Sequence, residues 1–172
     1  MVKLDPIFAD YNSTTPLCSD VLNAIQLWGG TVGNVSSSHQ FGQHVSKIYD
    51  EASDAICTRL NAMAYELLTC SSATEANHWF FYSLLSDRVD IPRVIMSAIE
   101  HPCVSKALTQ YSDQGVIDLQ ICRVMSNGMI DLEHFQSLLT PNTLLVSVIL
   151  ANNEIGTIQP LAELSRLAKG VG

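Results

Sequence analysis

A short polar stretch in the middle of the chain has the residue types of an anion-binding site. Ser71, Ser72 and Thr74 follow the apolar pair Leu67–Leu68, and an amphipathic segment begins directly after them. The free N–H groups and the positive dipole end of a helix N-terminus attract anions, and hydroxyl groups add further donors. The stretch therefore predicts either a phosphate cradle or an ordinary helix cap. Taken alone it favours the cap, because caps are far commoner than ligand sites.

Two other groups of polar residues also follow apolar runs. Asn152, Asn153 and Glu154 come directly after the run 144–150. Two amides and a carboxylate in that position must be hydrogen-bonded or hydrated, because each unpaired buried polar group costs about 1–3 kcal/mol. The group predicts either a polar ligand site or a loop that satisfies its own hydrogen bonds.

Glu100, His101 and Pro102 end another apolar run. An imidazole there can lie on a planar ligand or transfer protons near neutral pH, although a helix-opening hydrogen bond is the simpler role. Cys103 is expected to pack rather than to act as a nucleophile. Anion donors, an imidazole and amides are together the groups that a phosphorylated aromatic cofactor requires.

These polar groups fall between segments with helical or strand periodicity. Ser19 is expected to cap the first helix, and Asn61 to follow the longest one. The run 144–150 is the best candidate for a central strand that is covered on both faces. Helices are predicted over residues 19–28, 41–60, 74–86, 102–114, 131–139 and 160–169, and strands over 66–69, 93–98, 116–121 and 144–150.

The alternation of strands and helices from residue 66 onward predicts an α/β fold with a mostly parallel sheet and helices on both sides. In such sheets ligands bind at the carboxyl ends of the strands. The loops 70–74, 98–102 and 151–159 all fall at such ends, so they are expected to share one pocket.

Composition excludes several classes of protein. The net charge of −8 over 172 residues argues against a nucleic-acid surface. No apolar run approaches the roughly 20 residues of a membrane helix, and the first residues lack the apolar core of a signal peptide, so a cytoplasmic protein is expected. The five cysteines contain no C-x-x-C pair and the histidines show no ligand spacing, so neither a disulfide framework nor a metal site is predicted.

Five motifs in order then resemble the amino-terminal half of a cysteine desulfurase, in the class V aminotransferase group of fold-type-I pyridoxal-phosphate enzymes. The resemblance covers nearly the whole chain and implies a three-layer αβα fold. Its motifs are Asp10-Tyr11-Asn12-Ser13-Thr14-Thr15-Pro16, Gly33-Asn34-Val35-Ser36-Ser37-Ser38-His39, Ser71-Ser72-Ala73-Thr74-Glu75-Ala76-Asn77, Glu100-His101-Pro102 and Ala151-Asn152-Asn153-Glu154-Ile155-Gly156-Thr157-Ile158-Gln159-Pro160.

The resemblance implies roles for the matched residues. Ala73 and Thr74 would bind the phosphate of pyridoxal 5'-phosphate. His101 would stack on its ring and shuttle protons as the catalytic residue, and Asn153 would bond the ring's 3-oxygen. Asn12 would line the substrate side. The loop ending at His39 would lie near the site of a homodimer partner.

The complete enzyme that the resemblance implies takes sulfur from L-cysteine, leaving L-alanine and an enzyme persulfide. A sulfur-acceptor protein would then deliver that sulfur to iron–sulfur cluster assembly or to thio-modification. By domain, residues 1–16 are expected to be an N-terminal segment and 17–172 an incomplete cofactor-binding large domain. The C-terminal part of that domain and the small domain are expected to be absent from these residues.

The sequence departs from the family's pattern in three ways. Val35 replaces a usual proline, and Ser72 a usual glycine, which is tolerable only if the backbone there needs no positive φ. The family's cofactor-binding lysine, ring-pairing aspartate, substrate-binding arginine and nucleophilic cysteine lie in its other half. The lysines present are Lys3, Lys47, Lys106 and Lys169. None has the family's context, so the chain is predicted to be inactive alone.

Several alternatives stay open at this point. The chain is either a truncated or split enzyme that associates with a complementary C-terminal half, or a non-catalytic remnant that acts as a dimerisation or binding module. A selenocysteine lyase or another class V relative would share the same motifs. A nucleotide-binding domain is disfavoured because neither G-x-G-x-x-G nor G-x-x-x-x-G-K-[ST] occurs. An unpaired sheet edge is expected to make the isolated chain poorly soluble or dependent on association.

Overall fold

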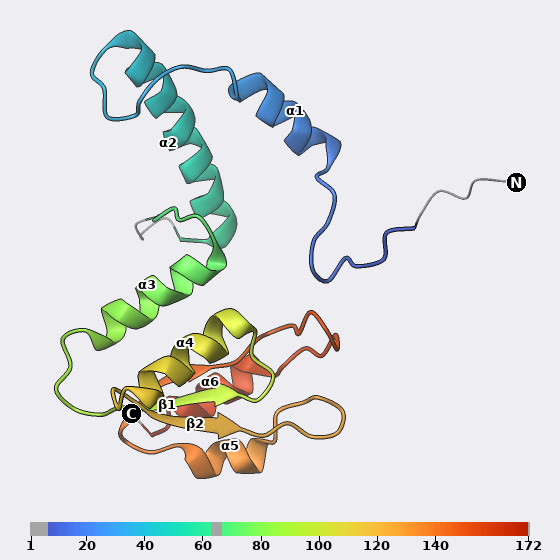
Figure 1. Ribbon diagram of the computed structural model, residues 1–172, viewed down its shortest axis with the longest axis vertical. Coiled ribbons are helices and arrows are strands. Elements are labelled where there is room, and N and C mark those ends of the chain that lie inside the picture. Colours follow the sequence, from blue (N-terminus) through green and yellow to red (C-terminus); the bar gives the residue numbers. More distant parts are fainter. Residues whose placement is uncertain (1–6, 63–66, 172) are drawn as a thin grey trace, which may run out of the picture. The chain divides into compact units, whose positions relative to one another are not determined.

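The computed structural model describes residues 7–62 and 67–171. The chain forms two compact units, residues 1–69 and 70–172 (Figure 1), and each is described by itself. The first contains α1 (Ser19–Trp28) and α2 (Gln40–Leu60). The second contains α3 (Ala73–Leu85), β1 (Arg93–Ser97), α4 (Pro102–Asp113), β2 (Asp118–Cys122), α5 (Leu132–Leu138), β3 (Thr143–Ser147) and α6 (Leu161–Ala168).

The two helices of the first unit form where the helical periodicity of the sequence predicts them. The longest described helix is α2, and it ends at Asn61, whose φ of 53° is the left-handed conformation that asparagine tolerates at a helix end. The predicted Ser19 cap is wrong: Cys18 holds the N-cap position of α1 and makes no side-chain cap bond. Serine is the better capping residue, but Ser19 is already the first residue of the helix and therefore does not occupy the N-cap position.

The second unit is built on a three-stranded parallel sheet in the order β2-β1-β3. The central strand is therefore β1, which is buried from Val94 to Ser97. The prediction that the run 144–150 is the central strand is wrong, because β3 is an edge strand among the described strands and its residues are half-buried. Its predicted coverage on both faces is confirmed, because Leu144 and Leu145 pack with α3 and α4, and Val146 packs with α5 and α6. Apolar content predicts that a strand belongs in a core, but not which of its edges is paired.

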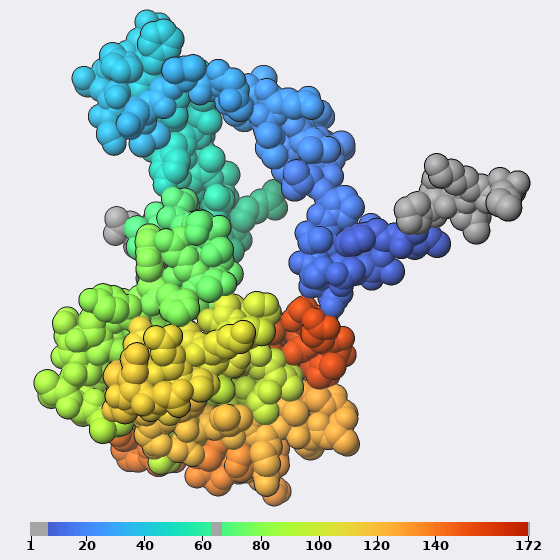
Figure 2. Space-filling model, viewed as in Figure 1, coloured from blue at the N-terminus to red at the C-terminus, as the bar shows by residue number. Residues whose placement is uncertain are grey.

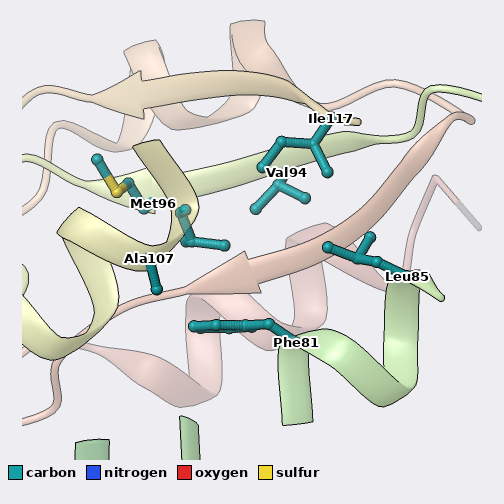
Figure 3. Packing of buried hydrophobic residues seen from close by; sticks show 7 residues of the cluster. Phe81, Leu85, Val94, Met96, Ala107 and Ile117 are labelled. Carbon is teal, nitrogen blue, oxygen red and sulfur yellow. The ribbon is translucent and has the colours of Figure 1, made fainter. Parts of the chain in front are cut away.

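Alternate residues of β1 point to opposite faces of the sheet, as the period of two requires. Val94 and Met96 pack beneath α3 and α4 in one cluster, whereas Ile95 packs against α5 and α6 in the other. Figure 3 shows Phe81 and Leu85 of α3 pointing toward the first cluster. In Figure 1, α4 lies on one side of β1 and β2 and α5 on the other, and in Figure 2 the atoms of α4 (yellow) form part of the surface of the second unit. The predicted three-layer αβα arrangement is confirmed.

The element boundaries of the second unit lie within three residues of the predicted ones. The predicted strand 66–69 is wrong over residues 67–69, which form no strand, while Glu66 lies outside the described residues. A short run with strand propensity forms a strand only where a neighbouring strand pairs with it, and none of the described strands pairs with these residues. None of the described helices is long and apolar enough to cross a membrane.

Candidate cofactor site

The site lies where the sheet changes the direction of its connections. The loop after β1 leads to α4 on one face, whereas the loop after the neighbouring β3 leads to α6 on the opposite face. The two chain segments therefore separate at the carboxyl ends of β1 and β3. In open α/β sheets this is the place where ligands bind.

A pocket of about 380 Å³ lies at this point, between the loops that follow the two strands. That volume is within the range of about 300–1,000 Å³ that small-molecule sites occupy. Two of the three loops that were expected to share one pocket do so; residues 70–74 do not line it. Its lining residues are Ile99, Glu100, His101, Pro102, Asn152, Asn153, Glu154 and Ile155.

The carboxylate of Glu100 ties the ends of the two strands together. It accepts hydrogen bonds from the Ser97 hydroxyl (2.5 Å) on β1 and from the Ile149 N–H (2.6 Å) beyond β3. The Ser147 hydroxyl lies 3.4 Å from its other oxygen. Hydrogen bonds to a charged acceptor are the stronger ones, so this carboxylate fixes the spacing of the two pocket loops.

The side chain of Asn152 makes a second link between the same loops. Its amide donates to the Ile99 carbonyl (3.0 Å), and its oxygen accepts from the N–H groups of Glu154 (2.9 Å) and Ile155 (3.0 Å). Gly156 closes the turn with a φ of 71°, a conformation that side chains rarely adopt. Asn152 therefore has the loop-satisfying role, which leaves the exposed Asn153 beside it on the pocket wall.

His101 is the N-cap of α4, and its ring carries a defined hydrogen bond. The Nδ1 atom accepts from the Cys103 N–H at 3.1 Å. Because Nδ1 is an acceptor, the proton of the neutral ring is on Nε2. His101 therefore caps the helix, as the simpler interpretation predicts, and also presents an imidazole at the pocket.

Cys103 connects this imidazole to α3. Its thiol lies 2.9 Å from His101 Nδ1 and accepts a hydrogen bond from the Asn77 side-chain amide at 3.2 Å. Asn77 belongs to the second turn of α3, so the contact joins the helix of the candidate anion site to the pocket residue His101. The thiol is half-buried and makes these two polar contacts.

The first turn of α3 has the form of a helix cap. The Ser72 hydroxyl accepts from the Glu75 N–H (3.2 Å), while the Glu75 carboxylate accepts from the N–H and the hydroxyl of Ser71 (2.7 Å each). These bonds from Ser71 lower the pKa of Glu75. Ser72 has a φ of −165°, an extended backbone that any residue adopts, so serine fits where the family usually has glycine.

This cap leaves some donors of α3 unused. Among the described residues, no hydrogen-bond acceptor faces the N–H groups of Ala73 and Thr74 or the Thr74 hydroxyl. These groups are at the positive end of the helix dipole. The hydroxyls of Ser71 and Ser72 take part in the cap. Of the predicted phosphate cradle, only the donors of Ala73 and Thr74 therefore remain available.

The other predicted site residue, Asn12, lies in the first unit. It belongs to a turn in which the N–H groups of Ser13 and Thr14 donate to the Asp10 carbonyl (3.3 and 3.4 Å). His39 caps α2 by accepting from the Gly42 N–H at 3.3 Å. The roles of both residues toward a substrate or a partner subunit stay predictions.

Sequence reasoning missed what Glu100 and Cys103 do. Both are within two residues of His101, but a strand-end glutamate gives no signal that it spans to a second strand, and a cysteine in a first helical turn usually packs. The buried Cys122 fits that default, because burial raises the pKa of its thiol to about 11. No group of three metal-binding side chains occurs among residues 7–62 and 67–171.

The comparisons with known proteins all point to one family. The model of the family "Aminotransferase class-V" matches residues 7–172. The cysteine desulfurase IscS of Rickettsia prowazekii is 35% identical over 167 residues, which are 95% of this chain and 40% of that protein. The Rickettsia bellii protein of the same name is 35% identical over 170 residues. The chain thus spans about 40% of the length of the curated relatives it matches.

Solved structures agree with these relatives. A NifS-like protein superposes with a TM-score of 0.87 at 28% identity, over 92% of this chain and 44% of that one. DndA from Streptomyces lividans superposes with a TM-score of 0.77 at 29% identity, over 96% of this chain and 47% of that one.

Proposed function

The chain belongs to the class-V aminotransferase family, and we propose that it is the cofactor-binding part of a cysteine desulfurase-like enzyme. The proposed cofactor is pyridoxal 5'-phosphate. The complete enzyme would act on L-cysteine, release L-alanine and pass the sulfur to an enzyme cysteine. Its partners would be a second subunit and a sulfur-acceptor protein of iron–sulfur cluster assembly or thio-modification, in the cytoplasm.

The start of α3 fits the phosphate end of this cofactor. The N–H groups of Ala73 and Thr74 point out of a helix N-terminus, where a doubly charged phosphate is stabilised by backbone donors and by the dipole. The Thr74 hydroxyl adds a third donor. Glu75 is turned onto Ser71 by two hydrogen bonds of 2.7 Å, so its negative charge is engaged by the cap.

The pocket between the two loops fits the aromatic end. His101 would lie on one face of the ring, with its Nε2 proton available to a reacting group. The Asn153 amide would donate to the ring oxygen. When bound, the cofactor supplies an electron-withdrawing ring that stabilises negative charge next to an amino group. Glu100 and Asn152 would hold His101 and Asn153 in place through the bonds described above.

One observation carries the proposal: the hydrogen bond from Asn77 to the Cys103 thiol. It connects α3, which holds the free anion donors, to α4, whose cap residue His101 lines the pocket. A ligand with a phosphate at one end and a planar ring at the other matches this pair of sites. Neither site alone would specify such a ligand.

A second candidate function is a non-catalytic binding module. The pocket has no lysine in its lining, and the described lysines are Lys47, Lys106 and Lys169. Covalent attachment of the cofactor and the steps that depend on it require a lysine from elsewhere. On this interpretation the chain binds the cofactor weakly, or binds a partner, without turnover.

The test is direct binding of pyridoxal phosphate to the purified chain, measured by equilibrium dialysis. The account predicts saturable binding with a 1:1 ratio. Thr74→Val removes a hydroxyl donor and is expected to weaken binding by about tenfold or more, in the range of a lost hydrogen bond to a charged group. Thr109→Val, which makes the same change on an exposed part of α4, is the matched control and should leave binding within twofold.

Activity separates the two candidate functions. Adding the remaining part of a full-length relative should restore sulfide release from L-cysteine if the chain is part of an enzyme. Selenocysteine or an amino acid without sulfur as the preferred substrate would assign it to another class V activity. Absence of saturable binding by the wild-type chain would contradict the cofactor assignment itself.

A further inference from the structure

Two hairpin loops of the second unit pack against each other beside the pocket. They are the β2–α5 hairpin (residues 123–131) and the Asn153 loop (residues 151–159). Antiparallel bridges close both loops: Val124 with Ile130, and Ala151 with Ile158. The Asn153 loop supplies four residues of the pocket lining, whereas none of the described residues 123–131 lines the pocket. The β2–α5 hairpin therefore reaches the pocket through the Asn153 loop.

The side chain of Gln159 ties the two loops together. It is only 3% exposed, and its amide oxygen accepts from the Ile130 N–H at 2.9 Å. Its amide nitrogen donates to the Gly128 carbonyl at 2.8 Å and lies 3.5 Å from the Thr157 hydroxyl. A shift of one loop against the other would leave these buried polar groups unpaired, which is costly. The Gln159 amide therefore fixes the distance between the two loops.

Gly128 lies directly against two side chains of the Asn153 loop. A Cβ atom at this position would lie 2.6 Å from Cδ1 of Ile155 and 2.8 Å from Cγ2 of Thr157. Both distances are well below the optimal separation of about 3.5–4.0 Å between carbon atoms. The φ of Gly128 is 77°, which also favours glycine. The close packing of the two loops therefore requires the absence of a side chain at this position.

Hydrogen bonds inside the Asn153 loop connect the contacted residues to Asn153. The Asn152 N–H donates to the Thr157 carbonyl at 3.0 Å, and the Asn152 side-chain oxygen accepts from the Ile155 N–H at 3.0 Å. The Gly156 N–H donates to the Asn152 carbonyl at 2.9 Å. Because Asn153 directly follows Asn152 in this closed turn, a displacement of Ile155 or Thr157 is passed on to Asn153.

We propose that Gly128 and Gln159 are positioning residues of the pocket, through which the β2–α5 hairpin sets the place of Asn153 toward a bound aromatic ring. The inference rests on the proposed function for its ligand, pyridoxal phosphate, and extends it to residues outside the pocket lining. A side chain at position 128 would force the side chains of Ile155 and Thr157 to turn, or the Asn153 loop to shift. Either change alters the pocket wall, because Ile155 lines it.

The test compares two glycine variants of the whole chain by equilibrium dialysis with pyridoxal phosphate. Gly128→Ala should weaken binding about fivefold, in the range of one displaced hydrogen bond from Asn153 to the ring oxygen. Gly115→Ala is the matched control, because its φ of 72° imposes the same kind of backbone strain on alanine. A methyl group there would point into open space in the described part of the chain. The affinity of this control should therefore stay within about twofold of the wild type.

A rescue variant separates positioning from general damage to the fold. Ile155→Val removes Cδ1 and Thr157→Ser removes Cγ2, the two atoms that the new methyl group would meet, and the serine keeps the hydroxyl beside Gln159. In a chain that carries both changes, adding Gly128→Ala should alter the affinity by no more than about twofold. A fivefold loss that persists in this background would overturn the proposal, because backbone strain alone would then explain it.

Gln159→Leu removes both hydrogen bonds of the buried amide and should also weaken binding about fivefold. Gln110→Leu makes the same change on an exposed position of α4 and should stay within about twofold. Unchanged affinity in a folded Gln159→Leu protein would contradict the role of Gln159. Because the loss of a buried amide also lowers stability, the glycine variants decide the question if this protein does not fold.

A second readout needs no ligand and therefore tests the inference apart from the cofactor. Nitrogen-15 magnetic resonance of the ligand-free chain should show the side-chain amide of Asn153 shifted in Gly128→Ala, unshifted in Gly115→Ala, and restored in the rescue variant. An Asn153 signal that Gly128→Ala leaves in place would contradict the proposal. If the signals respond as expected but the wild-type chain does not bind pyridoxal phosphate, the positioning role stands and the proposed cofactor alone is wrong.

Discussion

The carboxyl end of the sheet and its β3 edge differ in how far this chain completes them. At the carboxyl end, Glu100 and Asn152 link the loops of two strands by hydrogen bonds of 2.6–3.0 Å to Ile149 and Ile99. No buried side-chain nitrogen or oxygen is left without a partner in the described part of the chain. At the edge, an apolar strand and an apolar helix border an open groove. The pocket loops are therefore tied together by hydrogen bonds within the chain, whereas the outer edge of β3 is unpaired among the described residues.

The largest expected effect contrasts a central strand with the open edge. Ile95 is fully buried, so Ile95→Ala should lower the free energy of unfolding by about 2–5 kcal/mol. Val146→Ala on half-buried β3 should cost less than half as much. Urea unfolding followed by circular dichroism gives both values, and equal losses at the two positions would contradict the difference between the strands.

The next prediction concerns the carboxylate that ties the strand ends. Glu100→Ala leaves the Ile149 N–H and the Ser97 hydroxyl without their acceptor, which should cost about 1–3 kcal/mol. It should also weaken binding of pyridoxal phosphate, because His101 and Asn153 lie on the two loops that Glu100 joins. Glu100→Gln keeps one acceptor oxygen and should recover part of both losses. Unchanged cofactor affinity in a destabilised Glu100→Ala protein would limit the residue to a structural role.

A smaller effect is expected at Cys103, which joins α3 to the pocket. Cys103→Ala removes the contacts to Asn77 and His101 and should weaken cofactor binding about threefold, within the range of one neutral hydrogen bond. Cys103→Ser puts a hydroxyl in place of the thiol. This hydroxyl can bond both groups, so the serine variant should bind the cofactor like the wild type. Nuclear magnetic resonance of the His101 ring nitrogens should report the loss of the contact in the alanine variant only.

The smallest effect is at the opposite end of the strands, where Arg93 pairs with Asp118 at 2.8 Å. The hydrogen bond from Arg93, helped by one from Gln120, holds the pKa of Asp118 below its ordinary value of 3.8. The folded state therefore binds this proton less readily than the unfolded state. The pair stabilises the protein fully above the ordinary pKa of Asp118, and this contribution is lost as the pH falls through the lowered pKa of the folded state. Both side chains are partly exposed, which limits the effect to about 1 kcal/mol or less.

Asp118→Asn should accordingly reduce stability at pH 7 and make the decline between pH 5 and pH 3 shallower than in the wild type. Other carboxyls with lowered pKa values, those of Glu75, Asp90 and Asp131, keep part of that decline in the variant. Thermal unfolding across this pH range measures both slopes. Parallel curves for the two proteins would contradict the role of the pair.

How much the sequence predicts differs between the same two regions. The helical period gave α2 to within one residue, and Asn61 as its end. Two of the three polar motifs predicted that His101 and Asn153 follow strands and lie at one pocket, because parallel strands bring their carboxyl ends to one edge. The roles of Glu100 and Asn152 depend on which strands are neighbours, and strand order is not encoded in local periodicity.

The same reason explains the two wrong strand predictions. The run 144–150 is apolar enough to be buried on both sides, yet β3 has only one neighbour among the described strands, and the central position belongs to β1. Residues 67–69 have strand propensity but no partner. Both segments show that apolar content reports how a strand would be covered, whereas pairing decides whether and where it forms.

The central claim, that the start of α3 binds the cofactor phosphate, is tested most directly by phosphorus-31 magnetic resonance of pyridoxal phosphate added to the whole chain. Ala73→Pro removes one N–H donor at the first helical position, where proline fits the helix and the extended Ser72 before it fits proline. Ala73→Gly keeps that donor and is the control. The account predicts a shifted phosphorus resonance with the wild type and the glycine variant, and a much weaker shift with the proline variant. The same shift in all three proteins would contradict it.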